Sequence, residues 1–191
     1  KNKGKQIGLK GDIGVLSFNG NKIITTGNGG ALISHDNDLL IRAKHLSTTA
    51  KLSHDWKYEH DEIAYNYRLS NLSSAVGCAQ IENLDFFLEK KQKLSAFLKV
   101  NFENFDGLSF NNPQSIDCPN NWLNAILLGS EFKDDLDLIL YECNKNNIMT
   151  RPIWEPLHLL KPYKHFPKAD ITEAILISKK LINIPSSANL L

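Results

Sequence analysis

The sequence predicts a mixed α/β fold. Two short apolar runs near its start, residues 13–18 and 31–34, are typical of neighbouring strands joined by a turn. In the second half, segments with a strand pattern alternate with segments with a helix pattern, which indicates a small α/β unit. A long periodic segment between these two regions predicts a helix that bridges them.

The expected elements follow in chain order. Residues 36–50 predict a helix that begins with acidic residues, and a polar loop follows it. The long helix is expected to begin at a Ser70 or Asn71 cap and to run past Leu98, because apolar side chains recur there at helical spacing. Beyond it we expect strands at residues 122–128 and 148–154 and helices at residues 132–144 and 170–181.

Composition argues against several classes of protein. The 191 residues include 22 lysines and arginines against 21 aspartates and glutamates, without a basic stripe, so we expect no nucleic-acid partner. No apolar run approaches the roughly 20 residues that span a bilayer, and the first ten residues lack the apolar segment of a secretion signal. We therefore expect a cytoplasmic protein with no membrane partner. The three cysteines form no CxxC pair, which argues against a disulfide framework and a zinc site.

The segment SFNGNKIITTGNGG, residues 17–30, places Lys22 among small, polar and glycine residues. Taken alone, a lysine at a strand end is more often a solvated surface residue than a catalytic one. We expect its backbone near the end of a buried strand, where a desolvated lysine loses its proton and forms a Schiff base with an aldehyde cofactor or a carbonyl substrate. Ser17 supplies a hydroxyl close by, and the glycines let backbone approach a ligand, which favours phosphate binding.

Three further residues are candidates for ligand binding. Asn66, in YNYRLSN, precedes the expected long helix, where its amide either meets an anion or caps the helix, and capping or a turn is the commoner role. Arg151 and His158 lie in RPIWEPLH together with a tryptophan and two prolines. This segment fits a loop that recognises a nucleotide or sugar and fits a proline-held surface loop equally well.

The stretch 54–62 is rich in imidazole and carboxylate groups. Their spacing matches no metal-ligand pattern such as HExxH, and a mobile polar loop is the stronger interpretation. We therefore expect no metal site.

Together these motifs resemble those of the DegT/DnrJ/EryC1/StrS family of sugar-nucleotide aminotransferases. The resemblance covers essentially the whole chain, through GDIGVLSFNGNKIITTGNGGALI, YEHDEIAYNYRLSNLSSAVGCAQIE, RPIWEPLHLLKPY and NIPSS in that order. It implies the carboxy-terminal portion of a type I aminotransferase fold, like that of aspartate aminotransferase. It also implies pyridoxal 5′-phosphate as the cofactor.

The same resemblance assigns roles to individual residues. It implies that Lys22 holds the cofactor in covalent linkage and that Ser17 contacts the cofactor phosphate. It implies that Asn66 reaches the phosphate in the site of a partner subunit, and hence a homodimer with shared active sites. Arg151 and His158 would lie near the sugar nucleotide.

SFNGNKIITTG and INIPSS are most similar to the family branch that aminates UDP-linked 4-keto-6-deoxy-N-acetylhexosamines for bacterial surface glycans, with L-glutamate as the expected amino donor. A transaminase of another nucleotide sugar is an alternative. A related sugar dehydratase is disfavoured by Lys22, because a histidine replaces the lysine in those enzymes.

The family's chains are much longer, and the motifs of their first half do not occur here. We therefore expect residues 1–105 to form the end of the large cofactor-binding domain, including the long helix, and residues 106–191 to form an incomplete small α/β domain. A different alternative is a non-catalytic fragment or dimerisation module that binds no cofactor.

Overall fold

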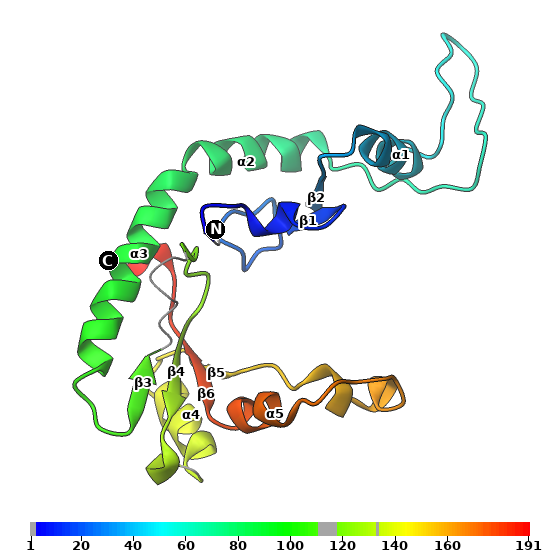
Figure 1. Cartoon of the computed structure of the whole chain (residues 1–191). Helices are drawn as coiled ribbons and strands as arrows, with labels where there is room; N and C mark the ends of the chain where they lie inside the picture. Colours follow the sequence, from blue (N-terminus) through cyan, green and yellow to red (C-terminus); the bar gives the residue numbers. More distant parts are fainter. Residues whose placement is uncertain (1–2, 111–117, 133) are drawn as a thin grey trace. The chain divides into compact units, whose positions relative to one another are not determined.

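The computed structural model of the chain describes residues 3–110, 118–132 and 134–191. They form two compact units (Figure 1). The first unit contains the described residues up to Phe86 together with Cys118, and the second contains those from Phe87 onward. These units are defined by contacts within this chain, so the assignment of residues 1–105 and 106–191 to the domains of a longer enzyme stays a prediction.

The first unit begins with a two-stranded antiparallel sheet. Strand β1, Gly14–Ser17, pairs with β2, Gly30–Ile33, so that Ser17 lies opposite Gly30. Both strands were predicted from their apolar runs, and both are confirmed. The expectation that the first strand is buried is wrong for this chain: Val15 is 76% exposed, because a two-stranded ribbon leaves one face uncovered.

Helix α1, Asn37–Ser47, follows β2 and confirms the predicted helix. The carboxylate of Asp36 caps it by accepting hydrogen bonds from the backbone N–H groups of Asp38 and Leu39, at 2.8 and 3.2 Å. The helix ends earlier than we expected. Thr49 and Ala50 have φ values of 68° and 49°, a left-handed conformation in which a right-handed helix cannot continue.

The expected long helix is two helices. Helix α2, Asn71–Glu82, begins at Ser70, whose hydroxyl accepts a hydrogen bond from the Ser73 N–H at 3.1 Å. Helix α3, Leu84–Phe102, continues the chain and runs into the second unit. The break falls at Asn83, whose φ of −100° and ψ of 7° depart from helical values, and its side chain donates to the Ala79 carbonyl at 2.8 Å.

The second unit is built on a four-stranded antiparallel sheet with the order β3-β4-β6-β5 (Figure 1). Its strands are β3, Leu108–Phe110; β4, Asn124–Leu128; β5, Arg151–Pro152; and β6, Leu181–Ile184. Ile126 pairs with Ile182 at the centre, and Leu128 and Ile184 complete the buried cluster. Leu98 and Phe102 of α3 pack against this cluster, as do Leu136, Ile139 and Leu140 of helix α4, Leu136–Lys145.

Several predicted bounds in this unit are corrected. The expected strand 148–154 is reduced to Arg151–Pro152, an edge strand, because proline has no N–H to donate to a sheet ladder. Helix α5 is Thr172–Ser178, and Leu181, which we expected at its end, begins β6 instead. Strands β3 and β6 were not predicted. Within the described residues, no helix has both the length and the apolar content needed to cross a membrane.

Lys91 of α3 is a buried lysine that joins three segments of the second unit. Its side chain is 5% exposed, and its Nζ atom donates to the backbone carbonyls of Trp122, at 3.2 Å, and Ser186. The Ser186 hydroxyl in turn accepts the N–H of Asn124 at 2.8 Å. Burial lowers the pKa of the Lys91 ammonium group, because desolvation disfavours its charged form.

Replacing Lys91 with methionine should therefore destabilise the second unit by about 1–3 kcal/mol, the cost of leaving a buried acceptor unsatisfied. The measurement is urea unfolding followed by tryptophan fluorescence, since Trp122 and Trp154 stack with ring centroids 6.0 Å apart in this unit. Lys93→Met is the control, because Lys93 is exposed and pairs only across the helix surface with Glu89. Equal urea midpoints for the two variants would contradict the role given to Lys91.

The lowered pKa of Lys91 also determines the direction in which the free energy of unfolding changes with pH. The unfolded chain binds this proton more tightly than the folded chain. The free energy of unfolding therefore rises with pH between the lowered pKa and the ordinary value of 10.5. The part of the slope of unfolding free energy against pH that Lys91 contributes should be absent from Lys91→Met, as urea unfolding at a series of alkaline pH values would show.

Candidate active site

The connection between β1 and β2 holds Lys22 in a pinned loop. We call residues 18–29 the Lys22 loop. At its base, Phe18 N–H donates to the Gly29 carbonyl at 2.9 Å and Thr26 N–H donates to the Phe18 carbonyl at 3.1 Å. At its tip, Lys22 N–H donates to the Asn19 carbonyl at 3.0 Å and closes a tight turn. These bonds fix the backbone on both sides of Lys22.

Gly29 shows why the Lys22 loop needs glycine at its base. Its φ is +88°, in the left-handed region that favours glycine, and a Cβ atom there would lie 2.7 Å from Cδ1 of Leu69. The residue that precedes the α2 cap therefore packs directly on the loop. A larger residue at position 29 would separate the loop from this support.

Lys22 and Ser17 lie at the two ends of one turn. Ser17 is the last residue of β1, and its exposed hydroxyl accepts a hydrogen bond from the Asn19 N–H at 3.4 Å. Lys22 is half-buried and lies in the turn just beyond β1, near the strand end as expected. The structure brings an amine and a hydroxyl to the same short segment, as the sequence analysis expected.

Asn66 lies beside the end of α1. It forms an isolated antiparallel bridge with Thr48, and the neighbouring Tyr65 and Tyr67 donate their N–H groups to the carbonyls of Leu46 and Ser47, at 3.0 and 2.9 Å. The Asn66 side chain is exposed. It does not cap α2, whose N-cap is Ser70, so the capping role considered for this asparagine is wrong.

The polar loop that follows α1 is anchored to that helix by an ionic cluster. Arg42 donates to both carboxylate oxygens of Glu62, with one bond of 2.6 Å. His45 Nε2 lies 2.7 Å from Oδ1 of Asp61. We call these four residues the clasp. It holds the base of the loop, residues 61–62, on α1, and the segment that contains Asn66 follows directly.

The clasp residues shift one another's ionisation. A hydrogen bond with His45 lowers the pKa of Asp61, and a hydrogen bond from Arg42 lowers the pKa of Glu62. Donor atoms of His45, Asp61 and Glu62 lie within 4.8 Å of one another, a grouping that the sequence analysis missed because His45 comes from α1. Arg42 donates to both carboxylate oxygens of Glu62. The expectation that this cluster binds no metal stays a prediction.

Arg151 and His158 belong to the second unit. Arg151 lies on the edge strand β5, where its Nη1 atom donates to Oδ1 of Asn144 at 2.9 Å and to the Thr150 carbonyl at 2.8 Å. His158 lies in the 3-10 helix Leu157–Leu159. Its Nε2 atom is shielded from solvent and has no hydrogen-bond partner among the described residues, which marks it as a polar atom that a ligand could satisfy.

The donor set of the Lys22 loop fits an aldehyde that bears a phosphate. The primary amine of Lys22 is the group that condenses with an aldehyde, and the Ser17 hydroxyl is an ordinary donor to a phosphate oxygen. Gly27, with a φ of +83° and no atom within 4 Å of the position of a Cβ, leaves open space on the backbone of the same loop. Pyridoxal 5′-phosphate carries both an aldehyde and a phosphate and so fits these groups.

Comparison with known proteins agrees with this fold. The model of the DegT/DnrJ/EryC1/StrS aminotransferase family matches residues 1–191. The chain belongs to this family of enzymes. The Helicobacter pylori protein PseC, an aminotransferase involved in the biosynthesis of pseudoaminic acid, has a solved structure that superposes with a TM-score of 0.93 at 26% identity, over 100% of this chain and 52% of that one. The chain therefore has a partial aminotransferase fold.

Three relatives are similar in sequence. EpsN of Bacillus subtilis (strain 168) is 37% identical over 98% of this chain and 49% of its own length. GDP-perosamine synthase of Escherichia coli O157:H7 is 34% identical over 100% of this chain and 50% of its own. The UDP-4-amino-4,6-dideoxy-N-acetyl-beta-L-altrosamine transaminase of Campylobacter jejuni (strain 81-176) is 36% identical over 53% of this chain and 27% of its own. The chain spans about half the length of the first two.

The clasp generates a prediction about acid pH. Both carboxyl pKa values are lowered, so the stability that the clasp contributes is present above the ordinary values of 3.8 and 4.5 and is lost as pH falls through the lowered ones. Carbon NMR titration of the two carboxyl groups should show midpoints below those values. Arg42→Gln should return the Glu62 midpoint toward 4.5, whereas Lys44→Gln, on the same helix, should not. An ordinary midpoint for both carboxyls in the unmodified chain would refute the clasp.

Proposed function

We propose that this chain is the lysine-bearing part of a pyridoxal 5′-phosphate-dependent aminotransferase that acts on a nucleotide-linked 4-keto-6-deoxy sugar in the cytoplasm. The observation that supports this most directly is the Lys22 loop. It holds the half-buried residue Lys22 one turn from Ser17 in a chain of the aminotransferase family. L-glutamate is the proposed amino donor, and a bacterial surface glycan is the proposed destination of the amino sugar.

Lys22 is the residue that we propose moves protons in the reaction. When bound, the cofactor stabilises negative charge on the substrate carbon from which a proton is removed. The Nζ atom of Lys22 takes that proton as a base and returns it as an acid in the other half of the reaction. The turn closed by Lys22 N–H and the Asn19 carbonyl limits the backbone movement that would carry the amine away.

Ser17 and Asn66 are proposed to hold the phosphate. A serine hydroxyl and an asparagine amide each offer a donor to a phosphate oxygen. Asn66 is attached to the end of α1, so its exposed side chain is available to a second copy of the chain. We therefore propose a homodimer in which Asn66 serves the partner's site.

Exposed apolar side chains support association with further protein. Val15 of β1 is 76% exposed, Ile63 is 89% exposed and Leu72 of α2 is 84% exposed. Contiguous apolar surface marks contact regions in soluble proteins, and we propose that these side chains contribute to such surface. In the proposed enzyme, the rest of its chain and the partner subunit cover them.

The substrate is proposed to be a UDP-linked 4-keto-6-deoxy-N-acetylhexosamine. The segments SFNGNKIITTG and INIPSS favour this branch. The similar relatives include both a GDP-sugar enzyme and a UDP-sugar enzyme, so the nucleotide needs a direct test. Arg151 and His158 are proposed to contact the sugar nucleotide. The exposed guanidinium of Arg151 suits a diphosphate, and the unpartnered Nε2 of His158 suits a hydroxyl.

Reduction with borohydride in the presence of pyridoxal phosphate tests the role of Lys22. The purified chain should give a trapped adduct at Lys22 in preference to its other lysines, as read by peptide mass spectrometry. Lys22→Arg should abolish that adduct and lower transamination by the complete enzyme roughly 10²–10⁴-fold, the usual contribution of a general acid–base. Lys51→Arg serves as the control. Even labelling of all lysines would favour an inert fragment or dimerisation module.

Nucleotide binding by the complete enzyme tests Arg151. Arg151→Lys should weaken binding of the preferred nucleotide diphosphate on the order of tenfold, because lysine cannot make the bidentate contact of a guanidinium. Calorimetric titration with UDP and with GDP measures this loss and identifies the nucleotide. Lys93→Arg, a conservative change on the exposed surface of α3, is the control. Unchanged affinity for both nucleotides in Arg151→Lys would remove this residue from the proposed site.

A further inference from the structure

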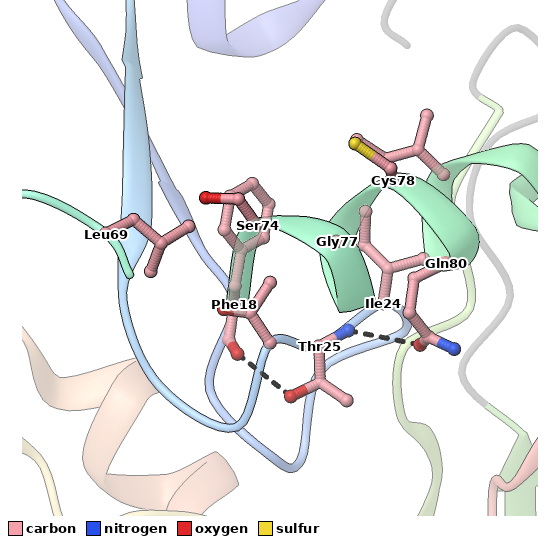
Figure 2. Close-up of a pocket in the computed structure, with 10 residues that line it drawn as sticks. Phe18, Ile24, Thr25, Leu69, Ser74, Gly77, Cys78 and Gln80 are labelled. Atoms are coloured by element: carbon pink, nitrogen blue, oxygen red, sulfur yellow. Dashed lines mark hydrogen bonds between the residues drawn. The ribbon is translucent and has the colours of Figure 1, made fainter. Parts of the chain in front are cut away.

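Helix α2 contacts the Lys22 loop through two residues one turn apart. The side-chain oxygen of Gln80 accepts a hydrogen bond from the Thr25 N–H at 3.3 Å (Figure 2). Three residues earlier, a Cβ atom on Gly77 would lie 3.0 Å from Cγ2 of Thr26. Residues three apart share one face of a helix, so one face of α2 meets both threonines of the loop.

Thr25 links α2 to the rest of the Lys22 loop by hydrogen bonds. Its hydroxyl donates to the Phe18 carbonyl at 2.9 Å and accepts the Gly27 N–H at 2.8 Å. Thr25 thus bonds to α2 through its backbone and to both ends of its own loop through its side chain. Lys22 is three residues before Thr25 in the sequence, so a shift of Thr25 along α2 moves the turn that presents the Lys22 amine.

The space beside this contact is a cavity of about 160 Å³. Phe18, Ile24 and Leu69 give it apolar walls, and Gln80 lies at its edge (Figure 2). Apolar packing alone specifies the position of a loop weakly, because it has no preferred direction. A directional hydrogen bond from a helix supplies a defined position.

We propose that Gln80 is a positioning residue that fixes the Lys22 loop on α2 and thereby sets the place of the Lys22 amine. This inference rests on the proposed function only in giving that amine a catalytic purpose. Gln80 acts on Lys22 through Thr25. Gly77 supports it by letting the backbone of α2 approach the loop without a side chain between them.

Three variants of the 191-residue chain test the proposal. Gln80→Leu removes the acceptor at similar volume, and Gln80→Glu retains an oxygen at the same place. Glu82→Leu is the matched control, because Glu82 lies at the exposed end of the same helix. Two measurements apply to each variant: hydrogen exchange of the Thr25 and Thr26 amides, and the rate of borohydride-trapped pyridoxal phosphate adduct formation at Lys22.

Gln80→Leu should raise the exchange rate of the Thr25 and Thr26 amides roughly fivefold, the effect of losing one ordinary hydrogen bond. It should slow adduct formation at Lys22 by a similar factor while the other lysines are unchanged. Gln80→Glu should restore both values, and Glu82→Leu should alter neither. Unchanged amide exchange in Gln80→Leu, or failure of Gln80→Glu to restore it, would overturn the proposal.

The two measurements separate this inference from the proposed function. If Lys22 of the unmodified chain forms no preferential adduct, the cofactor role fails, while amide exchange still tests whether Gln80 fixes the loop. If Gln80→Leu does not fold, Gly77→Ala provides the second test. The added methyl group should displace Thr26 and slow labelling of Lys22 in a chain that keeps Gln80. Normal labelling of Lys22 in Gly77→Ala would contradict the proposed dependence on α2.

Discussion

The carbonyl oxygen of Phe18 is the point on which the candidate site depends. It accepts hydrogen bonds from the Thr26 N–H and from the Thr25 hydroxyl, so that both threonines after the lysine turn are bound to the residue before it. The loop is closed on itself at its base before any ligand is present. The backbone that carries the Lys22 amine therefore has its position set by protein contacts.

The parts of the fold that follow from local rules were predictable. Asp36 caps α1 and Ser70 caps α2, as the preference of short polar side chains for helix N-termini predicts. The apolar face of Leu136, Ile139 and Leu140 also lies against the sheet of the second unit, as helical spacing indicates. Ser17 and Lys22 could be placed together for the same reason, since few residues separate them.

The contacts that were missed join segments distant in sequence. Gln80 and Thr25 are 55 positions apart, and Arg42 and Glu62 are 20 apart, so neither pair has a local signal. The break at Asn83 was missed for a different reason. Apolar spacing continues through it, and the break lies in the backbone of Asn83, with φ of −100° and ψ of 7°. Strand β6 was partly assigned to a helix because LINI fits either pattern when read alone.

The distribution of buried side chains relates the two units to a longer enzyme. In the second unit, Ile126, Leu128, Ile182 and Ile184 form a core of their own. Among the described residues of the first unit, Ala50 is the one buried apolar residue. Hydrogen bonds therefore fix the Lys22 loop locally, but burial of that size contributes little to a fold that must offset chain entropy. The first unit therefore leaves apolar side chains of its strand β1 and helix α2 exposed. In the proposed enzyme, these faces are where further protein would add apolar contacts.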